Sequence, residues 1–282
     1  MLYIFVINSR EDYRSKIRAE VERQLSDCLV EHLIYETAGQ GDAIRFVRLY
    51  CDLHDKEQAC FVACGGAGTL CEVASALVGH KGKSLAFLAF GKINEFCKSW
   101  PSRDFHSLRK IVDGEHRPLD IIRVGDNYAL NSVSIGFGIR KADRTSTLRD
   151  LLPKSSSKIA VSIDGEALPF KSFPLAIFAN GEWCGGHFHN SPEAVMDDGL
   201  MDVSIFKRTT MVQFFHVLRK CSIGAHLEDK FCRKRMVCRK ARRVELSSRD
   251  LIYVVLDGEV VASTNFSVEV LPSEIDFVMP GL

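Results

Sequence analysis

A glycine-rich segment that could bind phosphate is the first chemically suggestive feature of this sequence. The apolar residues 61–64 are followed directly by Gly65-Gly66-Ala67-Gly68-Thr69, and the chain then continues with helical spacing. Glycine lets backbone N–H groups approach an anion closely, and the start of a helix adds N–H donors and a favourable dipole. The segment therefore predicts a phosphate-binding loop, although a tight turn between a strand and a helix would also use glycine.

The first ninety residues predict the elements that would position this loop. Short apolar runs alternate with segments of helical spacing, which is typical of a parallel sheet with helices on its faces. The predicted strands are residues 2–7, 32–36, 61–64 and 84–90, and the predicted helices are residues 12–25, 42–53 and 70–78. Ligands of such sheets bind beyond the carboxyl ends of the strands, which is where the glycine loop lies.

The pattern changes after about Pro118, where short β-prone runs are separated by turn signals. Dense short strands predict an antiparallel sandwich or barrel. Hairpin turns are predicted at Gly125-Asp126-Asn127, Asp164-Gly165 and Asp257-Gly258, and one helix from Thr210 to Gly224. The predicted strands are residues 120–124, 128–135, 159–163, 175–179, 201–206, 244–246, 253–256 and 266–270. The domain boundary is therefore expected near residues 119–126.

Composition limits the class of protein. The 282 residues suit one large domain or two smaller ones, and a net charge of +1 implies no global attraction to nucleic acid. The ten cysteines lack paired CxxC spacing, so we expect free thiols in a reducing compartment rather than a zinc site. The N-terminus lacks the pattern of a signal peptide, and no apolar run is long enough to span a bilayer. We therefore expect a cytoplasmic protein with peripheral membrane contact at most.

Two basic runs, Arg233-Lys234-Arg235 and residues 239–243, precede a predicted strand. Such a run is usually a solvated face, but it could also contact anionic lipid headgroups. No aromatic interleaving or known motif supports nucleic-acid binding, so we expect no nucleic-acid partner.

Four motifs, read in order, resemble the diacylglycerol kinase catalytic family, which includes bacterial lipid kinases and sphingosine kinases. The family patterns are GGDGTxNE, PxGTxNDF, a stretch with GN, PxA and DGxLDV, and a closing LDGE followed by prolines. The matching segments are residues 65–72, 89–96, 179–203 and 256–259, with Pro272 and Pro280 after the last. The resemblance covers nearly the whole chain.

The resemblance implies a fold and a reaction. It implies a phosphofructokinase-like α/β domain over residues 1–124, an antiparallel β-sandwich domain over residues 125–270, and a tail of about residues 271–282 that returns to the first domain. In the cleft between the domains, ATP with Mg²⁺ would phosphorylate a lipid hydroxyl group of a diacylglycerol-like or sphingosine-like substrate. The expectation also allows a homodimer.

The resemblance also assigns roles to residues. Glu259 matches the catalytic base, and the side chain of Asp198 with the carbonyl groups of Val195 and Leu200 matches a structural Mg²⁺ site. The nucleotide-binding positions are Thr37, Gly65, Gly66, Ala67, Gly68, Thr69, Leu70, Cys71 and Lys92. Each assignment has a simpler alternative: Glu259 as a hairpin residue, Asp198 as a turn cap, and Thr37 as a helix cap. We interpret Asp164-Gly165-Glu166, which repeats the letters of the last motif, as a hairpin only.

Several positions depart from the family pattern, and all lie on the nucleotide side. Ala67 replaces the acid of GGDGT, Cys71 replaces an asparagine, and Lys92 replaces a threonine. The first loop, residues 8–12, lacks the proline and glycine of the family. The leading hypothesis is an ATP-dependent lipid kinase. The alternatives are a catalytically impaired member that acts as a nucleotide-binding or lipid-binding regulator, and a kinase for a soluble small molecule.

Overall fold

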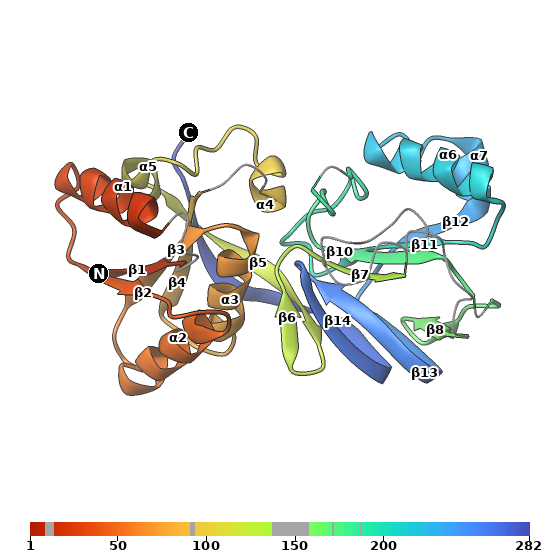
Figure 1. Cartoon of the computed structure of the whole chain (residues 1–282), viewed down its shortest axis with the longest axis horizontal. Helices are drawn as coiled ribbons and strands as arrows, with labels where there is room; N and C mark the ends of the chain where they lie inside the picture. The colour runs from red at the N-terminus through yellow and green to blue at the C-terminus, as the bar shows by residue number, and fades with distance from the viewer. Residues whose placement is uncertain (9–13, 91–93, 137–157, 171, 187) are drawn as a thin grey trace. The chain divides into compact units, whose positions relative to one another are not determined.

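The computed structural model of the chain divides into two compact units (Figure 1). The first unit comprises Met1–Asp120 with Ser273–Leu282, and the second comprises Ile121–Pro272. The structure describes residues 1–8, 14–90, 94–136, 158–170, 172–186 and 188–282. Lys92 of the predicted nucleotide site and residues 9–12 of the first loop lie outside the described residues.

The first unit contains the predicted parallel sheet. Its strand order is β14-β4-β3-β1-β2, where the end of β14 (Glu259–Met279) pairs in parallel with β4 through Phe277 and Leu85. The other strands are β1 (Leu2–Ile7), β2 (His32–Glu36), β3 (Ala59–Gly65) and β4 (Lys83–Ala89). All residues of β3 and β4 are buried, as expected for strands covered on both faces. The continuous apolar runs in the sequence reflect this burial.

Helices cover both faces of this sheet (Figure 1). Tyr3, Phe5 and Ile7 of β1 pack with α1 and α5 in one apolar cluster, while α2 and α3 pack against each other on the opposite face. The helices are α1 (Arg14–Ser26), α2 (Asp42–Leu53), α3 (Ala67–Leu77), α4 (Glu95–Lys98) and α5 (Leu108–Val112). The predicted α/β architecture is thus confirmed, although α4 and α5 were not predicted.

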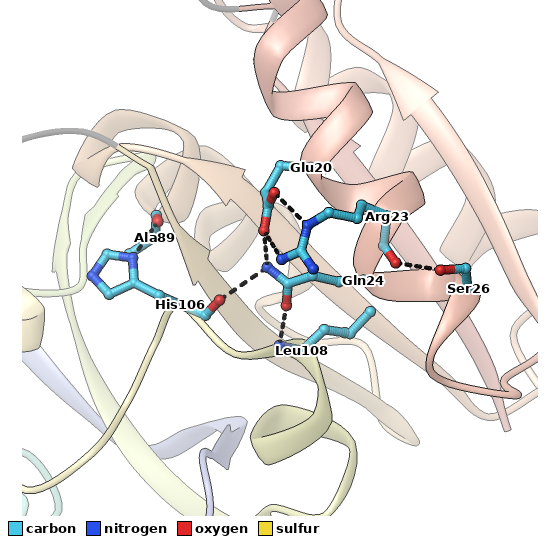
Figure 2. Close-up of polar contacts among 7 residues, drawn as sticks. All are labelled: Glu20, Arg23, Gln24, Ser26, Ala89, His106 and Leu108. Carbon is cyan, nitrogen blue, oxygen red and sulfur yellow. Dashed lines mark hydrogen bonds and ion pairs between the residues drawn. The ribbon is translucent and has the colours of Figure 1, made fainter.

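Polar contacts fasten α1 to the segment that follows β4 (Figure 2). The side chain of Gln24 donates to the carbonyl group of His106 at 3.0 Å and accepts from the N–H of Leu108 at 2.6 Å. The ring of His106 in turn lies 2.9 Å from the carbonyl oxygen of Ala89, the last residue of β4. The Gln24 side chain therefore joins the segment after β4 to α1, and the His106 ring joins it to the end of β4.

The second unit is a sandwich-like arrangement of antiparallel strands, as predicted. The strand order is β12-β11-β10-β7-β13-β14, with β5 and β8 attached to β14 and β13. The strands are β5 (Glu115–Val124), β6 (Asn127–Ala129), β7 (Ser132–Gly136), β8 (Ala160–Ile163), β9 (Glu166–Ala167), β10 (Leu175–Ala179), β11 (Met201–Phe206), β12 (Met236–Ala241) and β13 (Arg243–Leu256). One buried apolar cluster joins residues of most of these strands.

A second apolar cluster joins this sheet to two helices. Phe214 and Val217 of α6 (Met211–Ser222) and Cys232 of α7 (Lys230–Arg235) pack with apolar residues of β10 and β11. The helix predicted from Thr210 is confirmed, and the Thr210 side chain accepts from the N–H of Gln213 as its N-cap. We did not predict α7. Cys232 is its buried residue, and the basic residues that follow leave no apolar pattern with helical spacing.

The long strands differ most from the sequence prediction. The runs at 244–246 and 253–256 belong to one strand, β13, whose register with β14 shifts between Ser247 and Ile252. The run at 266–270 is the middle of β14, which extends from Glu259 to Met279. Exposed polar residues interrupt the apolar pattern of these strands, although each strand continues.

All three predicted hairpin turns are present. Gly125 lies in the β5–β6 turn with a positive φ, and the other two turns have positive φ at both central residues, as in type I′ turns. Asp164 and Gly165 join β8 to β9, and Asp257 and Gly258 join β13 to β14. All ten cysteines are free thiols, as predicted. Within the described residues, no helix is long and apolar enough to cross a membrane.

Candidate active site

The carboxyl ends of the parallel strands in the first unit lie at one edge of the sheet, and backbone hydrogen bonds continue just beyond the strands. The N–H of Asn8 donates to Cys64, that of Thr37 to Ile7, and that of Phe90 to Gly65, at 3.2, 3.0 and 2.8 Å. The segments that follow β1 and β4 are therefore fixed beside the end of β3, where the glycine loop begins, and the segment that follows β2 is fixed beside the end of β1. This edge is where the fold class places ligands.

The glycine loop has one packed glycine and two open ones. A Cβ atom on Gly65 would lie 2.5 Å from the Thr69 hydroxyl oxygen, whereas a Cβ on Gly66 or Gly68 would meet nothing within 4 Å. The Asn8 side chain donates to the same hydroxyl at 2.9 Å, so Thr69 is held from the end of β1. Gly66 is the N-cap of α3 and offers no side chain there. The open space thus lies at the start of a helix, a favourable place for a phosphate.

The loop that follows β2 is held by two carboxylates that we did not predict as site residues. Asp42 accepts from the N–H of Ala38 at 2.7 Å and from the hydroxyl of Tyr35 at 2.9 Å, and these bonds lower the pKa of the Asp42 carboxyl below its usual value. The N–H of Gly41 donates to Glu72 of α3 at 3.1 Å. A sequence signal existed for Glu72, because it is the last residue of the GGDGTxNE match.

The structure places the remaining predicted nucleotide positions as follows. Thr37 is buried at the end of β2, and it is not the cap of α2, whose N-cap is Gly41. The suggested capping role of Thr37 is therefore wrong. Ala67 is the first residue of α3 beside the open space. Leu70 and Cys71 are buried residues of α3.

In the second unit, four strands and one turn align a row of residues at one edge of the sheet. Lys240 of β12 pairs with Asp202 of β11, Asp202 with Ala179 of β10, and Ala179 with Ser132 of β7. The N–H of Asp257 then donates to the carbonyl group of Ser132 at 3.1 Å. The segments that carry the GN, DGxLDV and LDGE motifs therefore meet along the same edge.

The Asp257 carboxylate accepts three backbone hydrogen bonds at this edge. The donors are the N–H groups of Leu130 at 2.7 Å, Asn131 at 3.0 Å and Ser132 at 2.8 Å. These bonds explain why the predicted strand 128–135 is two strands, β6 and β7. Between them the backbone turns its N–H groups to Asp257 instead of to a neighbouring strand.

Asn131 and Asn180 connect the GN motif to this turn. The Asn180 side chain donates to the carbonyl group of Leu130 at 2.9 Å, and the Asn131 side chain donates to that of Trp183 at 2.6 Å. The N–H groups of Asn180 and Gly181 both donate to the carbonyl group of Asn131. Asn131 was missed at the sequence level, because it lies between two β-prone runs and nothing local marks it.

Glu259 is exposed at the start of β14, directly after the anchored turn and opposite Leu256. In the other Asp-Gly-Glu hairpin, Asp164 accepts from the N–H groups of Arg242 and Arg243, and Glu166 forms an ion pair with Arg239 at 2.7 Å. The interpretation of residues 164–166 as a hairpin is thus confirmed.

The proposed metal ligand Asp198 already binds two protein groups. Its Oδ1 atom accepts from the N–H of Leu200 at 3.0 Å, and its Oδ2 atom accepts from the ammonium group of Lys240 at 2.6 Å. The first contact and the positive φ of Gly199 confirm that Asp198 caps a turn. Val195, whose carbonyl group was assigned to the same site, is largely exposed.

These residues do not fit a bound Mg²⁺. The described residues contain no group of three or more His, Cys, Asp or Glu side chains placed to hold a metal ion. An ammonium group is bound to the carboxylate that the resemblance assigned to the metal. At the glycine loop, Ala67 supplies no oxygen ligand.

Comparison with known proteins gives matches to both halves of the chain. Residues 3–124 match the model of the diacylglycerol kinase catalytic domain, and residues 140–279 match that of the YegS C-terminal NAD kinase beta sandwich-like domain. A probable lipid kinase YegS-like from Shewanella frigidimarina is 30% identical over 77% of this chain and 75% of its own. Another probable lipid kinase YegS-like, from Serratia proteamaculans, is 26% identical over 98% of this chain and 93% of its own. The motif resemblance is therefore confirmed by independent matches to both halves of the chain.

Solved structures give the same result for the fold. A putative diacylglycerol kinase from Bacillus anthracis str. Sterne superposes with a TM-score of 0.75 at 20% identity, over 98% of this chain and 97% of that one. A second structure of a diacylglycerol kinase from the same organism gives a TM-score of 0.74, also at 20% identity. The likeness covers both units of the present chain.

Proposed function

The chain belongs to the diacylglycerol kinase catalytic family, among the YegS-like lipid kinases, and from this premise we propose that it transfers the γ-phosphoryl group of ATP to a lipid hydroxyl group. The observation that carries the proposal is the anchored turn of the second unit. Three backbone N–H groups fix Asp257, and Glu259 follows it at an exposed position. A rigid turn holds the carboxylate in one orientation, so that it can accept a proton from a substrate hydroxyl group placed beside it.

In the proposed reaction, the lipid hydroxyl oxygen attacks the γ-phosphorus atom of ATP. Glu259 accepts the hydroxyl proton, and the bond between the γ-phosphorus and the bridging oxygen breaks, so that its electron pair leaves with ADP. The N–H groups at the start of α3 would hold phosphate oxygens in the open space beside Gly66 and Gly68. The acceptor is proposed to be diacylglycerol-like or sphingosine-like.

The test compares the two Asp-Gly-Glu hairpins of the same chain. Transfer of labelled γ-phosphate is measured against a panel of lipids for wild-type protein, Glu259→Gln and Glu166→Gln. We expect Glu259→Gln to lower turnover by about 10²- to 10⁴-fold, which is typical of a general base, and Glu166→Gln to leave it unchanged. Wild-type turnover in Glu259→Gln, or an equal loss in both variants, would refute the role of Glu259.

A second candidate function is favoured by Ala67 and by the poor fit of the described residues to a metal ion. Without an acid at position 67, the loop lacks a ligand for the metal of Mg·ATP. The chain would then be an impaired family member that binds nucleotide or lipid and acts as a regulator. Calorimetry with Mg·ATP separates the two, because a kinase must bind the nucleotide at millimolar concentration. A screen of water-soluble acceptors tests the third possibility, a small-molecule kinase.

We also propose that α6 contacts an anionic lipid surface. Val212, Phe215 and Ile223 form an exposed apolar stripe on α6 and just beyond it, with exposures of 81, 48 and 67%. The helix contains no acidic residue, and Arg219 lies on the same stripe. An apolar stripe with basic neighbours suits the interface of an anionic bilayer. With ATP as donor and free thiols throughout, the proposed location is the cytoplasm.

We infer that the basic runs contribute less to lipid contact than α6 does. Arg239 and Lys240 are engaged in ion pairs with Glu166 and Asp198. Arg235 lies 3.5 Å above the ring of Phe231. We therefore assign lipid contact to α6 rather than to residues 239–243.

A further inference from the structure

We propose that Lys240 is a built-in cation that replaces the divalent ion expected at Asp198, so that this corner of the second unit folds without metal. The Lys240 ammonium nitrogen lies 2.6 Å from Asp198 Oδ2 and 3.6 Å from Asp202 Oδ2. It thus bridges two carboxylates that would otherwise repel each other. The family resemblance assigns a metal to one of them, and in this chain a side chain supplies the positive charge.

The strand register explains how the lysine reaches this position. Lys240 lies directly opposite Asp202 in the antiparallel pair of β12 and β11. Side chains at directly opposite positions lie on the same face of a sheet, within about 5.5 Å at Cβ. Asp198 lies in the turn that leads into β11, and its Oδ1 atom accepts from the N–H of Leu200. The ammonium group therefore joins the turn to the strand that follows it.

The charges at this corner disfavour a divalent ion. Mg²⁺ requires nearly octahedral oxygen ligands, and it would have to displace the ammonium group from Asp198 Oδ2. All three side chains are only partly exposed, at 32% for Lys240, 26% for Asp198 and 18% for Asp202, so solvent screens their interaction less than at an open surface. A second cation at the same place would meet strong repulsion from Lys240.

The ion pair of Lys240 with Asp198 and Asp202 lies at the sheet edge that carries the motif residues. Asp202 also pairs with Ala179 across β11 and β10, and Ala179 directly precedes Asn180 of the GN motif. A cation that holds the turn at Asp198 against β11 and β12 therefore stiffens the same edge that carries Asn180 and Asp257. This inference does not rest on kinase activity, because it concerns how the edge is held together.

Thermal unfolding without nucleotide tests the proposal. We expect the midpoint of wild-type protein to agree within about 1 °C between excess EDTA and MgCl₂. In Lys240→Met, the two carboxylates lose their cation, so the midpoint in EDTA should fall. It should then rise by about 2–4 °C when MgCl₂ reaches tenfold its dissociation constant. Lys240→Arg keeps the charge and should remain insensitive to Mg²⁺.

Arg239→Met is the matched control, because it removes a cation from the neighbouring position of β12 that pairs with Glu166 instead. It should not create a response to Mg²⁺. Binding of Mn²⁺, measured by electron paramagnetic resonance, provides a second readout that needs no stable Lys240→Met protein. If the proposal holds, wild-type protein and Asp198→Asn should bind the same amount of Mn²⁺. One Mn²⁺ per wild-type chain that Asp198→Asn abolishes, or a wild-type midpoint that falls in EDTA, would overturn the proposal.

Discussion

The Asp257 carboxylate accepts a hydrogen bond from the backbone N–H of Ser132 at 2.8 Å, across 125 residues of sequence. The same carboxylate accepts from the N–H groups of Leu130 and Asn131, so this one side chain binds the backbone between β6 and β7. Asp257 also has a positive φ in the turn that precedes Glu259. The two acidic residues of this turn therefore have different roles, because Asp257 holds the backbone and Glu259 presents an exposed carboxylate beside it.

We predict that Asp257→Ala lowers the free energy of unfolding by about 2–4 kcal/mol, because it leaves three partly buried N–H groups without their acceptor. Urea unfolding measures the change. Asp164→Ala is the control, since Asp164 occupies the equivalent turn and accepts from the N–H groups of Arg242 and Arg243 at an exposed position. It should cost less than half as much. Equal losses would mean that the turn conformation, rather than the triple acceptor, determines the stability.

The architecture could be predicted from sequence wherever burial and chain pairing leave a local pattern. The fully buried strands β1, β3 and β4 appear as continuous apolar runs, and the type I′ turns appear as Asp-Gly pairs. The break at Leu130 and Asn131 could not be predicted, because its cause is the distant Asp257. Contacts between residues far apart in sequence leave no local periodicity.

The two neighbouring glycines of the glycine loop, Gly65 and Gly66, should respond differently to alanine. Gly65→Ala places a Cβ atom 2.5 Å from the Thr69 hydroxyl, so it should lower the free energy of unfolding by about 1–3 kcal/mol. Gly66→Ala meets nothing within 4 Å and has an ordinary φ of −99°, so it should lower the free energy of unfolding less than Gly65→Ala does, with only the small cost of alanine at an N-cap. It should instead weaken nucleotide binding, because the methyl group occupies the space proposed for phosphate. Calorimetry and thermal unfolding of both variants separate these effects, and nucleotide affinity unchanged in Gly66→Ala would exclude this space as the phosphate site.

Restoring an acid at Ala67 should strengthen nucleotide binding. An aspartate at the first position of α3 is favoured by the helix dipole and supplies an oxygen ligand for the metal carried by Mg·ATP. We expect Ala67→Asp to raise the affinity for Mg·ATP several-fold, whereas Ala67→Asn, of similar shape but uncharged, should raise it less. Calorimetry with and without Mg²⁺ measures both. If neither affinity nor turnover changes, the missing acid does not limit the protein.

The motifs single out candidate residues but not the partners of those residues. Glu259, Asp198 and the glycine loop each lie within a short, recognisable pattern, and their proposed roles remain predictions. The cation at Asp198 was not found, because Lys240 lies 42 residues away and reaches Asp198 only through the pairing of β11 with β12. In the sequence it looked like one more member of a basic run.

The buried histidine His226 should make stability depend on pH. Its side chain is 1% exposed, and burial lowers the pKa of His226 from its usual 6.5, only partly opposed by the backbone of Asn190. Below about pH 6.5, His226 binds a proton in the unfolded chain but stays neutral in the folded chain. The free energy of unfolding should therefore fall as the pH drops toward the pKa of His226 in the folded state. The slope is at most about 1.4 kcal/mol per pH unit. Urea unfolding at pH 7.5, 6.5 and 5.5 should show this loss for wild type and for His216→Asn, an exposed histidine, but less for His226→Leu; an unchanged slope in His226→Leu would contradict it.

Binding to lipid vesicles tests the exposed stripe of α6. Replacing Val212 and Phe215 by serine removes two exposed apolar side chains without touching the buried face of the helix. If both enter the bilayer interface, partition to phosphatidylglycerol vesicles should fall about tenfold or more, since burial of each side chain contributes about 1 kcal/mol or more. Leu49→Ser, at a residue 59% exposed on α2, is the control and should bind as wild type does. Sedimentation with vesicles at low and high salt separates the apolar from the electrostatic contribution to vesicle binding. An equal fall in the vesicle binding of Leu49→Ser would show that the binding is not specific to α6.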